Sequence, residues 1–114
     1  MKKLRKRKKK LRIKKNKINE KNKIAINEIN NIYEKKIKDK KPIEFIDFIL
    51  EKYPFKNYDP SKKKKILNNS LEYILKEVLP RYHPDNYKER DNYIIYHEIS
   101  TLLVNIENSF IKNQ

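Results

Sequence analysis

His83 and His97 are the only histidines of this 114-residue chain, and they limit the chemistry it could perform. Asp85 stands two residues after His83, where a carboxylate could orient a catalytic base. A serine or threonine nucleophile would also need a glycine-bearing elbow or oxyanion loop, and the chain has no glycine. The histidines lack the short spacing of a zinc pair, and cysteine is absent. We therefore predict no enzyme activity, no metal site and no cofactor.

The tripeptide His83-Pro84-Asp85 is better suited to recognition than to catalysis. Proline fixes one backbone dihedral angle, so the flanking histidine and aspartate are expected to project as a preset donor and acceptor. Apolar residues recur at helical spacing on both sides of the tripeptide, which predicts two amphipathic helices over about 66–82 and 93–110. The expected core residues are Leu71, Leu75, Val78, Ile99, Leu103 and Ile106.

Prolines and short polar residues divide the rest of the globular part. Pro42 suits the first turn of a helix over 43–52, which is apolar on most sides. Asp59 is followed by a proline and is expected to cap the next helix. Pro80 should kink or shorten that helix at its end, because an interior proline costs about 3 kcal/mol. Asp91 is expected to cap the last helix.

The first 41 residues differ from the rest in charge. They hold 19 of the 30 Lys and Arg residues and only four of the 15 Asp and Glu residues, so they account for the whole net charge of +15. No proline interrupts them, which predicts a long charged helix that ends near Lys40, before Pro42. With about one apolar residue per heptad, this helix is too polar for a stable coiled coil.

The most basic block of this segment is a candidate site for RNA, the ribosome or an acidic protein. The alternative is a solubilising tail whose lysine content is exaggerated by AT-rich codon usage. The candidate residues are Lys2, Lys3, Arg5, Lys6, Arg7, Lys8, Lys9, Lys10 and Arg12.

The tripeptide follows Arg81-Tyr82, and the segment 96–103 reads Tyr-His-Glu-Ile-Ser-Thr-Leu-Leu. Together these features resemble the J domain of DnaJ-like co-chaperones, over about residues 42–111. The resemblance implies antiparallel helices II and III with helix I packed across them. It also implies that the protein recruits a DnaK-type heat-shock chaperone and stimulates its ATPase. The residues matching the family's chaperone-binding positions are Lys76, Arg81, Tyr82, His83, Pro84 and Asp85.

Three of the residues that depart from the family pattern bear on whether the chaperone is stimulated. Glu72 and Glu77 stand where basic residues are common, and Pro80 stands where an apolar residue is usual. These departures favour a first alternative, a degenerate J-like scaffold that does not stimulate a chaperone. A second alternative is a nucleic-acid- or ribosome-binding protein that acts through its basic segment.

The prediction is therefore an all-α protein with two parts, a basic helical or partly disordered arm over 1–41 and a J-like domain over 42–114. No apolar run approaches the ~20 residues of a membrane span, and no secretory signal is recognisable. We expect an intracellular protein, either cytoplasmic or nuclear.

Overall fold

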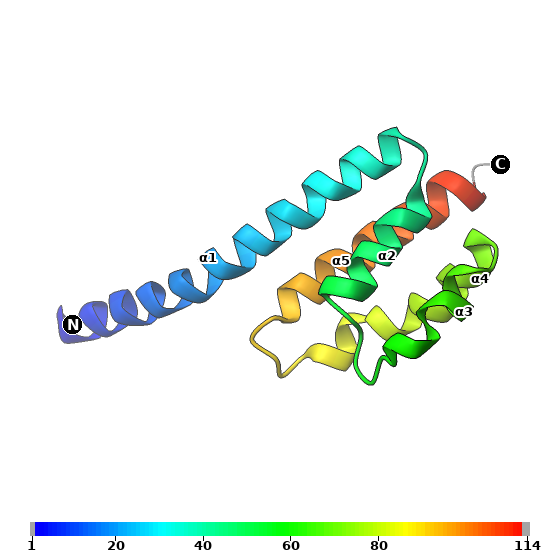
Figure 1. Cartoon of the computed structure of the whole chain (residues 1–114). Coiled ribbons are helices and arrows are strands. Elements are labelled where there is room, and N and C mark those ends of the chain that lie inside the picture. Colours follow the sequence, from blue (N-terminus) through cyan, green and yellow to red (C-terminus); the bar gives the residue numbers. More distant parts are fainter. Residues whose placement is uncertain (1, 113–114) are drawn as a thin grey trace.

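A computed structural model describes the backbone of residues 2–112 and the side chains of residues 20–112. The described residues form helices and no strand, so the prediction of an all-α fold is confirmed. The helices are α1 (Lys2–Lys38), α2 (Pro42–Lys52), α3 (Lys63–Leu67), α4 (Leu71–Val78) and α5 (Tyr93–Glu107) (Figure 1). Short helical turns, named η1 to η4, span Pro60–Lys62, Pro80–Tyr82, Pro84–Tyr87 and Asn108–Lys112.

A tight reversal joins α1 to α2. Lys40 adopts a positive φ of 57°, and the Lys41 N–H donates to the Lys36 carbonyl at 2.7 Å, which closes the C-terminal end of α1. Pro42 is the first residue of α2, as predicted, because its missing N–H would have no partner inside the helix. The two helices therefore run in opposite directions beside each other (Figure 1).

The second half of α1 packs against the rest of the molecule. Ile29 is fully buried in the common core, and the Asn22 side chain donates to the Asp91 carbonyl at 3.3 Å. Ion pairs of Lys36 with Glu44 and of Lys52 with Glu28 tie the surfaces of α1 and α2 together. The boundary predicted near residue 41 thus separates a basic part from a neutral part. In packing, the second half of α1 belongs to the same core as the residues after it.

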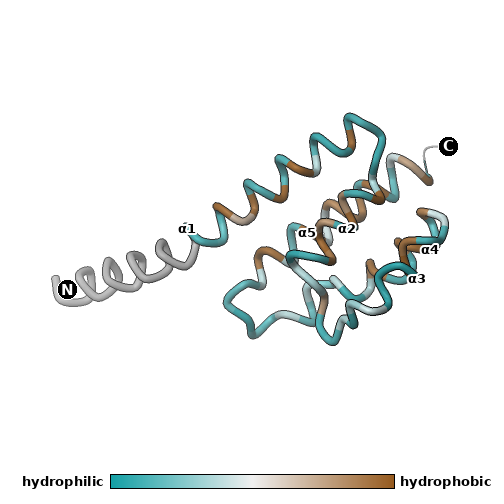
Figure 2. Tube along the Cα trace, viewed as in Figure 1, coloured by the Kyte–Doolittle hydropathy of each residue, from teal (hydrophilic) through white to brown (hydrophobic). Residues whose placement is uncertain are grey.

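One continuous core fills the space between α1, α2, α4 and α5. Hydrophobic positions recur along these helices between hydrophilic ones, as amphipathic packing requires (Figure 2). Of the six core residues expected beside the tripeptide, five are buried, and Leu71 is half-buried. The neighbouring Ile74 is fully buried instead. The largest contributions from α2 are Phe45, Ile46, Ile49 and Leu50.

The single helix predicted over 66–82 is wrong, because the chain breaks between α3 and α4. The Asn69 side chain donates to the carbonyls of Lys65 and Ile66, which satisfies the end of α3. The Ser70 hydroxyl accepts from the Tyr73 N–H, which caps the start of α4. The apolar spacing favours one continuous helix, but the hydrogen bonds from these two side chains to the main chain stabilise the break instead.

The predicted helix limits hold at some ends and fail at others. Asp59 caps the turn at Pro60, and α4 stops at Val78, before Pro80, as expected. Asp91 is not a cap, since α5 starts at Tyr93 after Asn92, and no side chain caps it. The last helix was expected to reach about residue 110, but α5 ends at Glu107 and a wider helical turn follows it.

Candidate functional site

The His-Pro-Asp tripeptide lies in the loop between α4 and α5, which approach each other in opposite directions (Figure 1). His83 has an extended backbone with ψ of 132°, as the residue before a proline prefers. Pro84 then starts the turn at Pro84–Tyr87. The side chains of His83 and Asp85 are 58% and 65% exposed, so both are available to a partner.

Hydrogen bonding fixes the orientation of the His83 ring. The Asp85 N–H donates to His83 Nδ1 at 3.1 Å. A neutral ring that accepts this hydrogen bond at Nδ1 carries its proton on Nε2. The Asp85 Oδ2 lies 3.6 Å from the same Nδ1. Because Nδ1 accepts the main-chain hydrogen bond, no hydrogen bond joins these two atoms. The neutral ring thus offers a donor at Nε2, and the exposed Asp85 carboxylate is an acceptor two residues away. That the two side chains bind a chaperone stays a prediction.

Lys88 is the cation nearest the loop carboxylate. Its Nζ lies 3.3 Å from Asp85 Oδ1, and both side chains are about two-thirds exposed. Exposed ion pairs of this kind contribute about 0–1 kcal/mol. A partner that offered a better hydrogen bond could therefore displace Lys88 from Asp85 at little cost.

Lys76 and Arg81 are exposed, but each has an acidic neighbour one helical turn earlier. Lys76 Nζ lies 4.0 Å from Glu72, and the Arg81 guanidinium lies 3.2 Å from Glu77 and over the ring of Phe55. These four charges cancel, so they give the surface formed by α4 and the following turn at Pro80–Tyr82 no net positive charge. Glu72 and Glu77, which depart from the family pattern, therefore neutralise the two basic side chains that the resemblance assigns to chaperone binding.

Tyr82 cannot touch a partner, although the resemblance places it among the binding residues. Its side chain is fully buried, its ring meets Phe55 edge-on, and its hydroxyl donates to the Tyr53 carbonyl at 2.8 Å. Its aromatic bulk and its one polar atom are both satisfied inside the molecule. Tyr82 therefore supports the loop from within and is not part of the exposed surface.

Tyr87 also holds the loop, and sequence reasoning missed it. Its ring stacks on Tyr96 with centroids 3.9 Å apart, and its hydroxyl donates to the Arg81 carbonyl at 2.8 Å. The same hydroxyl accepts from the Lys56 N–H at 3.0 Å, and Tyr96 donates to the Pro54 carbonyl at 3.0 Å. The only sequence signal was an aromatic residue three positions after Pro84, within an otherwise polar segment.

Burial raises the pKa of the hydroxyls of Tyr82, Tyr87 and Tyr96 above the ordinary value of 10.0. The folded protein therefore keeps these protons to higher pH than the unfolded chain does. Their stabilising contribution is complete below about pH 10 and is lost as the pH rises through the folded-state pKa.

The resulting prediction is a fall in the free energy of unfolding above about pH 10, by roughly 1.4 kcal/mol per pH unit for each such group. Tyr82→Phe should make this fall shallower, because it removes the most deeply buried hydroxyl. Tyr73→Phe is the matched control at an exposed position. Urea unfolding at about pH 8 and about pH 11 measures the difference. If the free energy of unfolding falls by the same amount between the two pH values in both variants, the role given to Tyr82 is contradicted.

Two further predictions concern residues at other places in the chain. His97 is exposed on α5, as predicted. Within residues 20–112, His, Asp and Glu side chains nowhere gather in threes as a metal ion would need. The nine basic residues between 2 and 12 belong to α1, but their side chains lie outside the described part.

Every helix of the described backbone is too short or too polar to span a membrane. Comparisons of this chain with protein-family models, with curated proteins and with solved structures found no match.

Proposed function

We propose that this protein is a J-domain-like co-chaperone, which recruits a DnaK-type heat-shock chaperone and stimulates its ATPase. The observation that carries the proposal is the exposed donor–acceptor pair of His83 and Asp85 on a loop stiffened by Pro84. Buried tyrosines hold this loop in place. A preset loop loses less conformational freedom on binding, so more of the interaction energy remains for recognition.

The protein supplies no chemistry of its own in this proposal. The loop offers a hydrogen-bond donor at His83 Nε2 and an acceptor carboxylate at Asp85, and the hydrolysis occurs on the chaperone. The direct test is the steady-state ATPase rate of a DnaK-type chaperone from the same cell, measured with and without this protein. An increase supports the proposal, and an unchanged rate at saturating protein contradicts it.

The charges on α4 make a further prediction for the same assay. Lys76→Ala and Arg81→Ala should lower the stimulation several-fold at low salt and much less at high salt, because exposed charges mainly steer association. Glu72→Gln and Glu77→Gln should act in the opposite direction, since each frees a basic neighbour from its pair. If Lys76→Ala and Arg81→Ala lower the stimulation equally at low and high salt, the two side chains do not act by long-range attraction of the chaperone.

A degenerate scaffold is the second candidate function. It is favoured by the cancelled charges of α4 and the turn at Pro80–Tyr82, because an acidic chaperone surface would gain little attraction from a surface without net positive charge. A scaffold would bind the chaperone, or another protein, without changing the ATPase rate. Binding together with an unchanged rate would therefore favour the scaffold over the co-chaperone.

A further inference from the structure

The longest part of the chain without a basic residue covers α5. No Lys or Arg occurs between Arg90 and Lys112, although these two residue types make up 30 of the 114 residues. Every other α-helix within residues 2–112 holds at least one lysine. The same stretch contains Asp91, Glu98 and Glu107, so α5 is an acidic helix in a basic protein.

One side of α5 is both exposed and uncharged at neutral pH. Ile94, His97, Thr101 and Val104 follow each other at spacings of three, four and three residues, and all four are exposed. Ile94 and Val104 are 46% and 38% exposed and are two of the four exposed large hydrophobic residues among residues 20–112. This is the spacing of a seam along which one helix packs on another. We call these four residues the uncharged face of α5.

Two carboxylates flank the uncharged face, since Glu98 and Glu107 each lie three residues from a member of it. Glu107 is paired with Lys112 at 3.4 Å, and Glu98 has no ion pair within 4.0 Å among residues 20–112. A second α5 packed here would bring carboxylates together with no cation from either helix between them, and nucleic acid would be repelled. The charges therefore favour a basic helix as the occupant.

The chain itself contains such a helix. Residues 2–18, here called the basic segment, hold 12 of the 30 Lys and Arg residues and no Asp or Glu, and they belong to α1. Leu4, Leu11 and Ile18 recur in it every seven residues, which keeps them on one side of a helix. Ala25 and Ile32 continue this series and pack against the core of their own chain. The series thus already serves as a packing face in the second half of α1.

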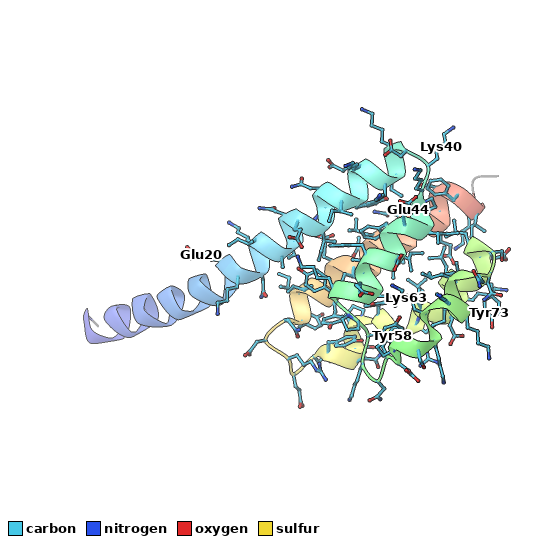
Figure 3. All side chains as sticks on the ribbon, in the orientation of Figure 1. Glu20, Lys40, Glu44, Tyr58, Lys63 and Tyr73 are labelled. Carbon is cyan, nitrogen blue, oxygen red and sulfur yellow. The ribbon has the colours of Figure 1, made fainter. Side chains whose placement is uncertain are left out.

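The basic segment cannot lie along α5 of its own chain. Asn22 donates to the Asp91 carbonyl at 3.3 Å, so α1 meets α5 at the start of α5. The two helices run in the same direction (Figure 1), and Glu20 lies at the end of the packed body (Figure 3). Because α1 is continuous from Lys2, the residues before Asn22 lead away from the start of α5. A basic segment on this face must come from a second copy.

We propose that the uncharged face of α5 binds the basic segment of a second copy of this chain. The seven-residue series of the segment packs against Ile94 and Val104, and its lysines and arginines lie near Glu98 and Glu107. Each copy offers both the segment and the face, so two copies make the contact twice around a twofold axis and close a dimer. This inference does not depend on the proposed function.

Sedimentation equilibrium of the full chain tests the dimer. At about 0.15 M salt the Debye length is about 8 Å, so the repulsion between two chains of net charge +15 is largely screened. We expect the mean mass to rise from 14.0 kDa toward twice that value as the protein concentration increases to about 1 mM, the range of a weak association. The mass of a single chain at every concentration overturns the inference.

Two substitutions at one position test the choice of a basic occupant. Val104→Lys should raise the dissociation constant of the dimer about tenfold or more, because it places a cation against the basic segment. Val104→Glu removes the same apolar side chain but should raise the constant no more than about threefold. Tyr73→Lys is the control on α4 (Figure 3), also at an exposed position, and should have little effect. Equal losses for Val104→Lys and Val104→Glu contradict a basic occupant.

Leu11→Asn tests the same contact from the basic segment. It should raise the dissociation constant about fivefold or more, because it removes an apolar anchor from the middle of the series. Ile13→Asn is the matched control, since it lies about 200° around the helix from Leu11 and outside the series. Equal effects of the two substitutions overturn the contact as proposed. Unchanged urea midpoints show that the variants stay folded.

Mixing two variants identifies the occupant. The double variant Leu4→Asn with Leu11→Asn impairs the basic segment and keeps the face, whereas Val104→Lys impairs the face and keeps the segment. Neither should associate alone, but the mixture should form a complex with one copy of each, because one intact segment meets one intact face. If the parent dimerises and the mixture forms no complex, the segment does not bind this face and the inference fails.

Discussion

Replacing Leu103 by alanine is expected to lower the free energy of unfolding by about 2–5 kcal/mol, as large-to-small changes in close-packed cores do. Leu103 is fully buried in the core that joins α1, α2, α4 and α5. The change removes apolar contacts and leaves a cavity that the neighbouring helices fill only in part. Urea unfolding followed by circular dichroism measures the loss.

The neighbouring residue provides the control for this prediction. Val104 follows on the same helix and is 38% exposed. Val104→Ala should change the stability by no more than about 0.5 kcal/mol, in the range of ordinary surface changes. Similar effects for the two substitutions would mean that α5 is not packed as the structure has it.

His83→Gln and Asp85→Asn are expected to abolish stimulation of the chaperone ATPase. Hydrogen bonds to charged groups contribute about 1.5–3 kcal/mol, so the loss of one should weaken productive binding roughly tenfold or more. Both side chains are more than half exposed, and their replacement should leave the urea midpoint nearly unchanged. The measurement is chaperone turnover at fixed concentrations of chaperone and variant.

Lys88→Ala separates the role of the carboxylate from that of its ion pair. This variant removes the cation 3.3 Å from Asp85 and keeps the carboxylate itself. Stimulation should be retained, because the exposed pair contributes little and a partner can replace it. A loss as large as that of Asp85→Asn would assign the activity to the pair rather than to Asp85.

The helices around the site were predictable where local signals agree. Pro42 starts α2 as a proline at the first helical position should, and Pro80 shortens the end of α4. Residues such as Leu75 and Ile99 are buried because their helical spacing places them on one face of each helix. The all-α fold follows from these same patterns.

The rest depends on side-chain hydrogen bonds and packing contacts, some local and some between distant residues, that the apolar pattern does not reveal. The break before Leu71 requires the side chains of Asn69 and Ser70 to bond the main chain, while the apolar spacing runs on through it. Asn22 of α1 meets the Asp91 carbonyl, 69 positions away. The sequence places Tyr87 in a polar loop, and only the structure shows that its ring stacks on Tyr96.

The loop of the candidate site could be predicted in part from the sequence. The exposure of His83 and Asp85 agrees with the expected loop, because Pro84 and the residue before it have narrow backbone preferences. The burial of Tyr82 was not foreseen, because a tyrosine beside a loop can face either solvent or core. The cancelled charges followed from spacing, since Glu77 stands four residues before Arg81.

The most direct test of the central claim is the steady-state ATPase rate of the DnaK-type chaperone from the same cell, with parent protein and with Asp85→Asn assayed in parallel. The account predicts a rate increase with the parent that rises to a plateau, and no increase with Asp85→Asn although it is folded. A parent protein that leaves the rate unchanged would contradict the co-chaperone function. A parent that stimulates and an Asp85→Asn variant that stimulates equally would contradict the mechanism assigned to the loop.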